Sequence, residues 1–115
     1  MPIVIVSGVP DSATQEMLER LCDDIKTVVA KTKGLGVSKN HVTVFFPEDK
    51  LKAGLGEEII VQVILFEKSY RTDAILGLMS EAIGLQIQTG YFPQAFVEVI
   101  PIPMDARRGY WSHRP

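Results

Sequence analysis

The start of the chain carries its most unusual chemistry. Pro2 follows Met1 and directly precedes the β-branched run Ile3 to Val6. Removal of Met1, which a small second residue such as proline generally permits, would leave a secondary amine. An ordinary α-amino group has a pKa of about 7.7–8.0, and apolar surroundings lower that pKa because they disfavour the charged form. Pro2 is therefore a candidate general base, although a proline can also simply begin an edge strand, where its missing N–H does little harm.

Lys68 and Arg71 are the second group of residues that could do chemistry. They lie between a long apolar stretch and a helical pattern, where side chains at a strand end can project into a cleft. A guanidinium group there can hold a carboxylate through two parallel hydrogen bonds. The same charges can also be solvent-exposed or pair with Glu67 and Asp73, so residue types alone leave both interpretations open.

Other chemistries find little support in the sequence. His41 and His113 have no cysteine or histidine at the spacing of a zinc site, so no metal is expected. No G-x-S-x-G is present, and Cys22 falls within a helical pattern, which favours a small buried thiol over a nucleophile. Gly34 and Gly36 follow that helix instead of opening one, unlike a phosphate-binding loop. We therefore expect no cofactor.

The elements that must position these residues follow one order twice. A strand at 3–6 precedes a helix, for which Ser12 and Gln15 have capping-box spacing and Gly34 provides a stop. A strand at 41–46 follows, opened by His41. Then come a strand at 58–66 and a helix from about Thr72 to Gly84 or Gly90. A strand at 96–102 follows, and Pro101 suggests that its end is an edge or leaves the sheet.

The repeated order predicts an α+β fold. We expect one domain, 1–115, with pseudo-repeats at about 2–47 and 58–103 and a C-terminal tail at 104–115. Two tandem β-α-β units would form a four-stranded mixed sheet with both helices on one face. The other face is also apolar, and nothing else in the chain is available to cover it. We therefore expect neighbouring subunits to do so.

Composition excludes several classes of partner. The formal net charge is −2, so the chain has no overall attraction for nucleic acid or an anionic membrane. No apolar run approaches the roughly 18 residues of a membrane span, and no signal peptide is evident. We expect a cytoplasmic protein with neither partner. Hydrophobic residues make up 46% of the chain, which favours a covered sheet or an apolar subunit interface.

Three features together resemble the tautomerase superfamily. They are Met1-Pro2 directly before a strand, two tandem β-α-β units, and Tyr70-Arg71-Thr72-Asp73 at a helix start. The resemblance is greatest to longer members such as macrophage migration inhibitory factor, the cis-chloroacrylic acid dehalogenases and malonate semialdehyde decarboxylase. Arg71-Thr72-Asp73 is similar to the Gly-Arg-Ser/Thr-Asp element of the short oxalocrotonate tautomerases. Lys68 and Arg71 have the separation of the two substrate-binding arginines in the cis dehalogenases.

The resemblance implies a homotrimeric, cofactor-independent tautomerase or isomerase acting on a small carboxylated enol or keto acid. Pro2 would be the catalytic base in an apolar pocket near a subunit boundary, and Arg71 would hold the substrate carboxylate. Lys68 stands where the dehalogenases have an arginine. Tyr110 and Trp111 resemble the aromatic C-terminal segment that lines the pocket of the cytokine-like members.

The resemblance leaves alternatives open. A protonated Pro2 would serve as an acid in decarboxylation or dehalogenation, and a third alternative is a non-catalytic trimeric binding protein. Tyr91 and His113 are further candidates for a second active-site group. The pocket lysine that follows a glycine in cytokine-like members has no counterpart, because Leu35 follows Gly34. The substrate itself is not specified by the sequence.

Overall fold

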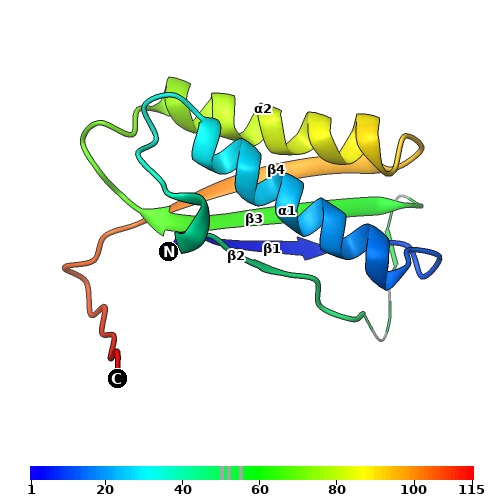
Figure 1. The fold of residues 1–115 in the computed structure, drawn as a ribbon, viewed down its shortest axis with the longest axis horizontal. Helices are drawn as coiled ribbons and strands as arrows, with labels where there is room; N and C mark the ends of the chain where they lie inside the picture. Colours follow the sequence, from blue (N-terminus) through cyan, green and yellow to red (C-terminus); the bar gives the residue numbers. More distant parts are fainter. Residues whose placement is uncertain (50, 52, 55) are drawn as a thin grey trace.

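The computed structural model of the chain describes residues 1–49, 51, 53–54 and 56–115. The element order is β1 (Ile3–Ser7), α1 (Gln15–Lys31), the 3₁₀ turn η1 (Lys39–His41), β2 (Thr43–Phe45), β3 (Glu58–Phe66), α2 (Asp73–Gly90) and β4 (Phe96–Met104). Within the described residues, four strands form one sheet in the order β2-β1-β3-β4 (Figure 1). β1 pairs in parallel with β2 and β3 in parallel with β4, while β1 and β3 are antiparallel. The predicted mixed sheet of two β-α-β units is confirmed.

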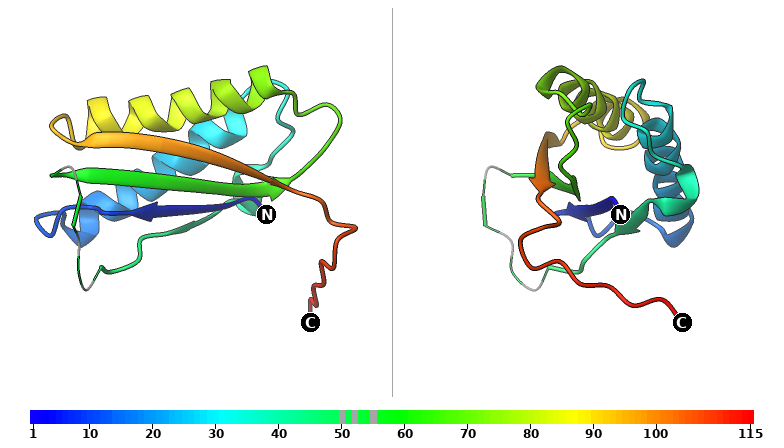
Figure 2. Two further views of the ribbon diagram at one scale, coloured as in Figure 1. Left: turned by 180° about the vertical axis from the view of Figure 1, so that it is seen from behind. Right: turned by 90° about the vertical axis from the view of Figure 1, so that its left-hand side faces the viewer.

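Both helices cover the same face of this sheet, as predicted (Figures 1 and 2). Side chains alternate between the two faces along β1 and β3, and those turned toward the helices are fully buried. They meet one stripe of each helix, and the fully buried members of this core include Val4, Val6, Leu21, Ile25, Ile59, Val61, Val63, Met79 and Ile83. No helix in the described part of the chain has the length and apolar character needed to cross a membrane.

Threonines cap the two helices. The Thr72 hydroxyl accepts a hydrogen bond from the Ile75 N–H at 3.3 Å, where the sequence placed the start of α2. At α1 the cap is Thr14, whose hydroxyl accepts from the Met17 N–H at 3.1 Å, and the predicted capping box at Ser12 is wrong. The Ala13 N–H donates to the Pro10 carbonyl at 2.9 Å, so a turn occupies residues 10–13. The helix therefore begins only after it, at Gln15.

Two strand boundaries also differ from the prediction. His41 does not open β2, because its N–H donates to the Ser38 carbonyl at 3.0 Å and closes a 3₁₀ turn. β4 runs on past residue 102 to Met104. The Phe96 N–H donates toward β3, so by alternation Pro101 and Pro103 direct their nitrogens to the free edge of the sheet. Their missing N–H groups interrupt no ladder bond, which lets the strand continue.

Neither helix covers the other face of the sheet (Figure 2). Hydrophobic side chains make up most of this face, together with Glu58, Gln62 and Glu98. Phe45 is 53% exposed on β2 and Phe96 is 61% exposed on β4, although both are large hydrophobic side chains. Cross-strand pairs connect Ile3, Ile64 and Ile102 through the middle of this face. We call it the open sheet face, defined by Ile3, Ile5, Phe45, Ile60, Ile64, Phe66, Phe96, Ile100 and Ile102.

Gly8→Ala is expected to lower the free energy of unfolding by about 2 kcal/mol or more. Gly8 follows β1 directly with a φ of +86°, and a Cβ atom there would lie 2.1 Å from the Glu58 carbonyl oxygen. The matched control is Gly77→Ala within α2, where an added Cβ meets nothing within 4 Å. That variant should gain about 0.5–1 kcal/mol from helix propensity. Urea unfolding measures both, and equal changes in the two variants would contradict the assignment of strain to Gly8.

Candidate functional site

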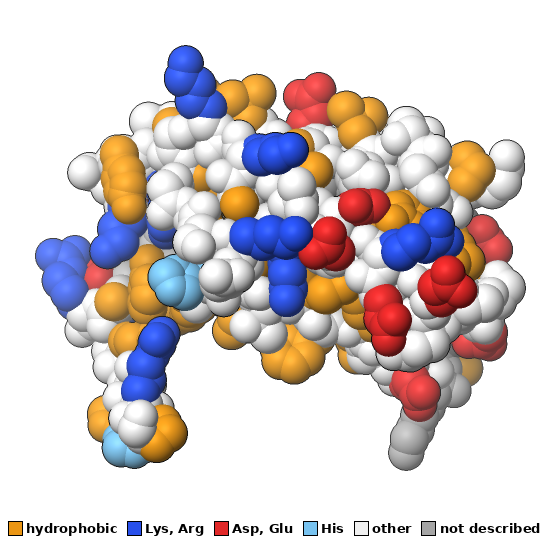
Figure 3. Space-filling view, viewed as in Figure 1, with side chains coloured by type: hydrophobic (Ala, Val, Ile, Leu, Met, Phe, Trp, Pro, Cys, Tyr) orange, Lys and Arg blue, Asp and Glu red, His pale blue; other side chains and the backbone are white. Residues whose placement is uncertain are grey.

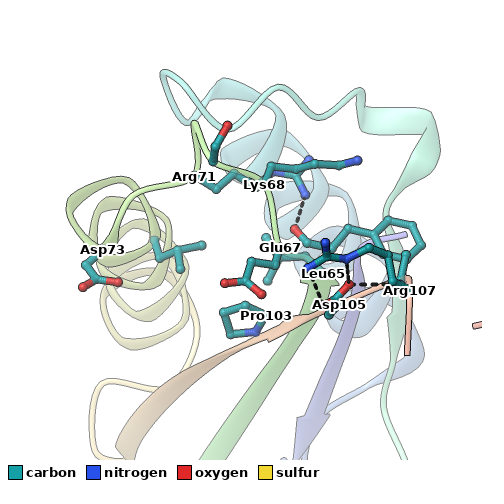
Figure 4. Close-up of a pocket in the computed structure, with 12 residues that line it drawn as sticks. Leu65, Glu67, Lys68, Arg71, Asp73, Pro103, Asp105 and Arg107 are labelled. Atoms are coloured by element: carbon teal, nitrogen blue, oxygen red, sulfur yellow. Dashed lines mark hydrogen bonds and ion pairs between the residues drawn. The ribbon is translucent and has the colours of Figure 1, made fainter. Parts of the chain in front are cut away.

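One end of the sheet brings the chain's first residues beside the ends of β3 and β4. β1 begins at this end, since Ile3 pairs with Ile64, and β3 and β4 finish there together at Phe66 and Met104. A cavity of about 620 Å³ opens at the same place (Figure 4). Its walls come from the end of β3, the turn into α2 and the segment after β4, and they comprise Leu65, Phe66, Glu67, Lys68, Ser69, Arg71, Asp73, Leu76, Pro103, Asp105, Ala106 and Arg107.

Pro2 lies next to this cavity but does not line it. The side chain of Pro2 is buried, and Met1 before it is half-buried. The Pro2 carbonyl accepts a hydrogen bond from the Thr43 N–H at 3.0 Å. Extending the β1–β3 register by one residue places Pro2 opposite Leu65, which is itself a wall of the cavity. Pro2 is therefore buried directly before β1, and the register makes Leu65 its link to the cavity.

Arg71 lines the cavity with part of its guanidinium already bonded to the protein. Nε donates to the Leu35 carbonyl at 3.0 Å, and Nη1 donates to the Phe66 carbonyl at 2.7 Å. The guanidinium carbon also lies 5.6 Å from the centre of the Tyr70 ring. A guanidinium has five N–H donors, so the Nη1–Nη2 edge retains N–H groups that can hold an anion.

Lys68 is exposed on the same wall, as the close-up shows (Figure 4). Among the described residues, no carboxylate forms an ion pair with its ammonium group. Its Nζ lies 5.8 Å from the centre of the Phe66 ring, and Tyr110 packs edge-on against that ring with centroids 4.9 Å apart. Tyr110 is thus brought to the same end of the sheet as Lys68 and Arg71.

The remaining sequence candidates lie away from the cavity walls. Trp111 is 80% exposed in the C-terminal tail and stacks with His113 at a centroid distance of 6.4 Å. Tyr91 follows the far end of α2, where its hydroxyl is hydrogen-bonded to the Asp24 carboxylate on α1. Burial, followed by this bond, raises the pKa of Tyr91 to about 12. Cys22 is half-buried on α1.

The structure adds charged residues that sequence reasoning did not select. Asp105 and Arg107 form an ion pair on the cavity wall, with Nη2 to Oδ2 at 3.0 Å and Nε to Oδ1 at 3.1 Å. Arg107 also donates its backbone N–H to Oδ1 at 2.9 Å. Glu67 stands nearby, with its N–H bonded to the Met104 carbonyl at 2.8 Å. The i, i+2 spacing of the acid and the arginine was the only signal of this pair in the sequence.

We expect the pKa of the Asp105 carboxyl to lie below its ordinary value of 3.8. The main cause is the hydrogen bonding from the Arg107 side chain, and the second is the hydrogen bond from the Arg107 backbone N–H. A lowered carboxyl pKa means that the pair is present above the ordinary value and is lost as the pH falls through the lowered one. Carbon-13 NMR titration of the carboxyl checks this. Arg107→Ala should return the Asp105 pKa toward 3.8, and an unchanged titration would show that the pair does not form in solution.

Charge is unevenly distributed over the molecule. Figure 3 shows Lys and Arg side chains gathered toward the end that carries the C-terminal tail, and most Asp and Glu side chains toward the opposite end. The cavity lies at the basic end, with Lys68, Arg71 and Arg107 in its walls. Glu67, Asp73 and Asp105 line the same cavity, so attraction of a small anion depends on the local placement of Lys68 and Arg71 and not on an excess of positive charge.

Metal ligands are not assembled in the described part of the chain. No group of three or more His, Cys, Asp or Glu side chains there is arranged to hold an ion. What the cavity offers chemically is hydrogen-bond donors, cations and carboxylates near the buried side chain of Pro2.

Comparison with known proteins identifies the fold. No protein-family model and no curated protein matches the chain. Among solved structures, a protein of unknown function from Vibrio cholerae is similar with a TM-score of 0.73 and 16% identity over 96% of this chain and 83% of that one. The fused 4-oxalocrotonate tautomerase W0, a symmetric trimer, gives a TM-score of 0.70 and 17% identity over 92% of this chain and 89% of W0.

A third similar structure is N1, a member of the cis-3-chloroacrylic acid dehalogenase family. Its TM-score is 0.64 and its identity 19%, covering 99% of this chain and 84% of N1. W0 and N1 both belong to the tautomerase superfamily. The resemblance predicted from the sequence is therefore confirmed at the level of the fold, and the chain has the tautomerase-superfamily fold.

Proposed function

We propose that the protein is a cofactor-independent tautomerase that moves a proton in a small carboxylated enol or keto acid. The N-terminal amine of Pro2, freed by removal of Met1, is the general base. It takes the proton from one position of the enol or keto acid and returns it to another, so the substrate is isomerised without gain or loss of atoms. Arg71 and Lys68 bind the substrate carboxylate.

The observation that carries this proposal is the placement of Pro2. It is buried at the start of β1, at the end of the sheet where Lys68 and Arg71 line a cavity of about 620 Å³. Burial and nearby cations both disfavour a protonated amine, so both lower its pKa toward the range useful for a base. The same cations supply the attraction that a carboxylated substrate needs.

Self-association as a homotrimer belongs to the proposal. The open sheet face exposes large hydrophobic side chains, including Phe45 and Phe96, that a monomer would leave in water. W0, which has the same fold, is a symmetric trimer. A cyclic trimer would cover this face, and Tyr110 and Trp111, both in the segment after β4, would lie near a subunit boundary.

A second candidate is a lyase or hydratase that uses protonated Pro2 as an acid. The similarity to N1 of the cis-3-chloroacrylic acid dehalogenase family favours it, together with the paired cations on the cavity wall. Lys68 presents a point charge where a second arginine would present a fork, which weakens bidentate binding of a carboxylate. We therefore place tautomerisation first.

The pH profile of phenylpyruvate enol–keto conversion separates the two candidates. For protein whose mass confirms loss of Met1, kcat/KM should rise with pH through a single titration near neutrality, because only the neutral amine accepts a proton. A rate that falls through the same range would favour a protonated Pro2 acting as an acid. Absence of activity at every pH would remove the tautomerase proposal.

A further inference from the structure

The guanidinium of Arg71 joins two segments that are far apart in the sequence. Nε reaches back 36 residues to the Leu35 carbonyl at 3.0 Å, and Nη1 reaches the Phe66 carbonyl at 2.7 Å. The group is only partly exposed, so water competes weakly for these bonds. A lysine at this position could not reproduce them, because one compact ammonium cannot present two donors in the fixed directions of a guanidinium.

The first of these segments has no regular secondary structure to hold it. Leu35 follows the end of α1 and is flanked by Gly34 and Gly36, which have φ values of +89° and +70°. Its side chain is fully buried, and its own N–H donates to the Thr32 carbonyl at 3.2 Å. Arg71 supplies a partner for its carbonyl and so fixes where the segment passes the start of α2.

The second segment leads to Lys68, for which the described part of the chain supplies no ion pair. Phe66 ends β3, and its ring lies beneath the Lys68 ammonium and against Tyr110. The Arg71 backbone N–H donates to the Lys68 carbonyl at 2.9 Å, which closes the turn between them. Side chain and backbone of Arg71 therefore hold both ends of the short segment from Phe66 to Lys68.

We propose that Arg71 is a positioning residue in addition to being a source of charge. By bonding the Leu35 and Phe66 carbonyls it sets the wall of the cavity and the place of the Lys68 ammonium. This inference rests on the proposed function for its kinetic consequences. Its structural consequences are independent of any activity.

Arg71→Lys separates positioning from charge. It keeps a cation but loses the bridge, that is, the two hydrogen bonds from the guanidinium to the Leu35 and Phe66 carbonyls. We expect kcat to fall about tenfold or more with both phenylpyruvate and its methyl ester, since misplaced groups slow turnover of either substrate. The matched control is Arg20→Lys, an exposed position on α1 outside the cavity. If kcat of Arg71→Lys equalled that of Arg20→Lys with both substrates, the inference would be overturned, whether or not KM for the acid changed.

Two NMR measurements test the bridge without reference to turnover. In the wild-type protein the Arg71 Nε–H should exchange with water at least tenfold more slowly than that of exposed Arg114. In Arg71→Lys the amides of Leu35 and Glu67 should exchange faster than in Arg20→Lys. An Arg71 Nε–H that exchanges as fast as that of Arg114 would refute the bridge. A slow Nε–H in a protein without tautomerase activity would instead refute the proposed function and leave the bridge standing.

Discussion

Pro2→Ala is expected to lower kcat/KM for phenylpyruvate enol–keto conversion by about 100-fold or more, within the range that a positioned general base contributes. The substitution leaves an N-terminal amine but replaces the rigid secondary amine at the start of β1. Stopped-flow or steady-state absorbance of the enol measures the rate, and the mass of each protein verifies that Met1 has been removed.

Two controls isolate the amine of Pro2. Pro93→Ala changes an exposed proline in the turn between α2 and β4, at the opposite end of the sheet from the cavity, and should leave the rate within about twofold of wild type. Protein that retains Met1 has an amide in place of the amine, so it should be as inactive as Pro2→Ala. Equal rates for the wild type and Pro2→Ala would rule out the amine as base.

Ile64→Asp is expected to convert a trimer into a monomer. Ile64 lies on the open sheet face in the inner strand β3, between Ile3 of β1 and Ile102 of β4. An aspartate there would place an unpaired charge in an apolar subunit interface. The free energy of assembly would become less favourable by roughly several kcal/mol per subunit, which is the cost of burying an unpaired ion. Light scattering on a sizing column should show the particle mass fall from three times 12.8 kDa to 12.8 kDa.

The matched control introduces the same residue on the outside of the molecule. Leu78 is 55% exposed on α2, so Leu78→Asp should keep the mass of the wild-type particle. Far-UV circular dichroism confirms that both variants remain folded. A wild-type mass of 12.8 kDa, or loss of assembly in Leu78→Asp alone, would contradict a trimer built on the open sheet face.

The architecture could be predicted because the spacing of apolar residues along each element indicates which side chains are buried. Uninterrupted apolar runs gave the central strands, and apolar residues at helical spacing gave the two helices on one face. Boundaries were less accurate where a few local hydrogen bonds decide them. Thr14 replaces Ser12 as the cap of α1, and His41 belongs to a 3₁₀ turn because its N–H meets the Ser38 carbonyl.

The candidate site was less predictable because much of it depends on backbone groups and on the tail. Lys68 and Arg71 were selected from their type and place, and the structure puts both on one cavity. The hydrogen bond from Arg71 to the Leu35 carbonyl could not be predicted, because every residue has a backbone carbonyl and the residue type does not indicate its partner. Asp105 and Arg107 reach the cavity only because β4 runs on to Met104, past two prolines whose nitrogens face its free edge.

Titration of the Pro2 amine shows whether it can be a base at neutral pH. Nitrogen-15 NMR of wild-type protein lacking Met1 can follow the Pro2 amine from pH 5 to pH 10. We predict a pKa below the ordinary α-amino range of about 7.7–8.0, so that the neutral amine predominates at pH 7.5. An amine that stays protonated through neutral pH would rule out Pro2 as the general base and assign it the role of an acid.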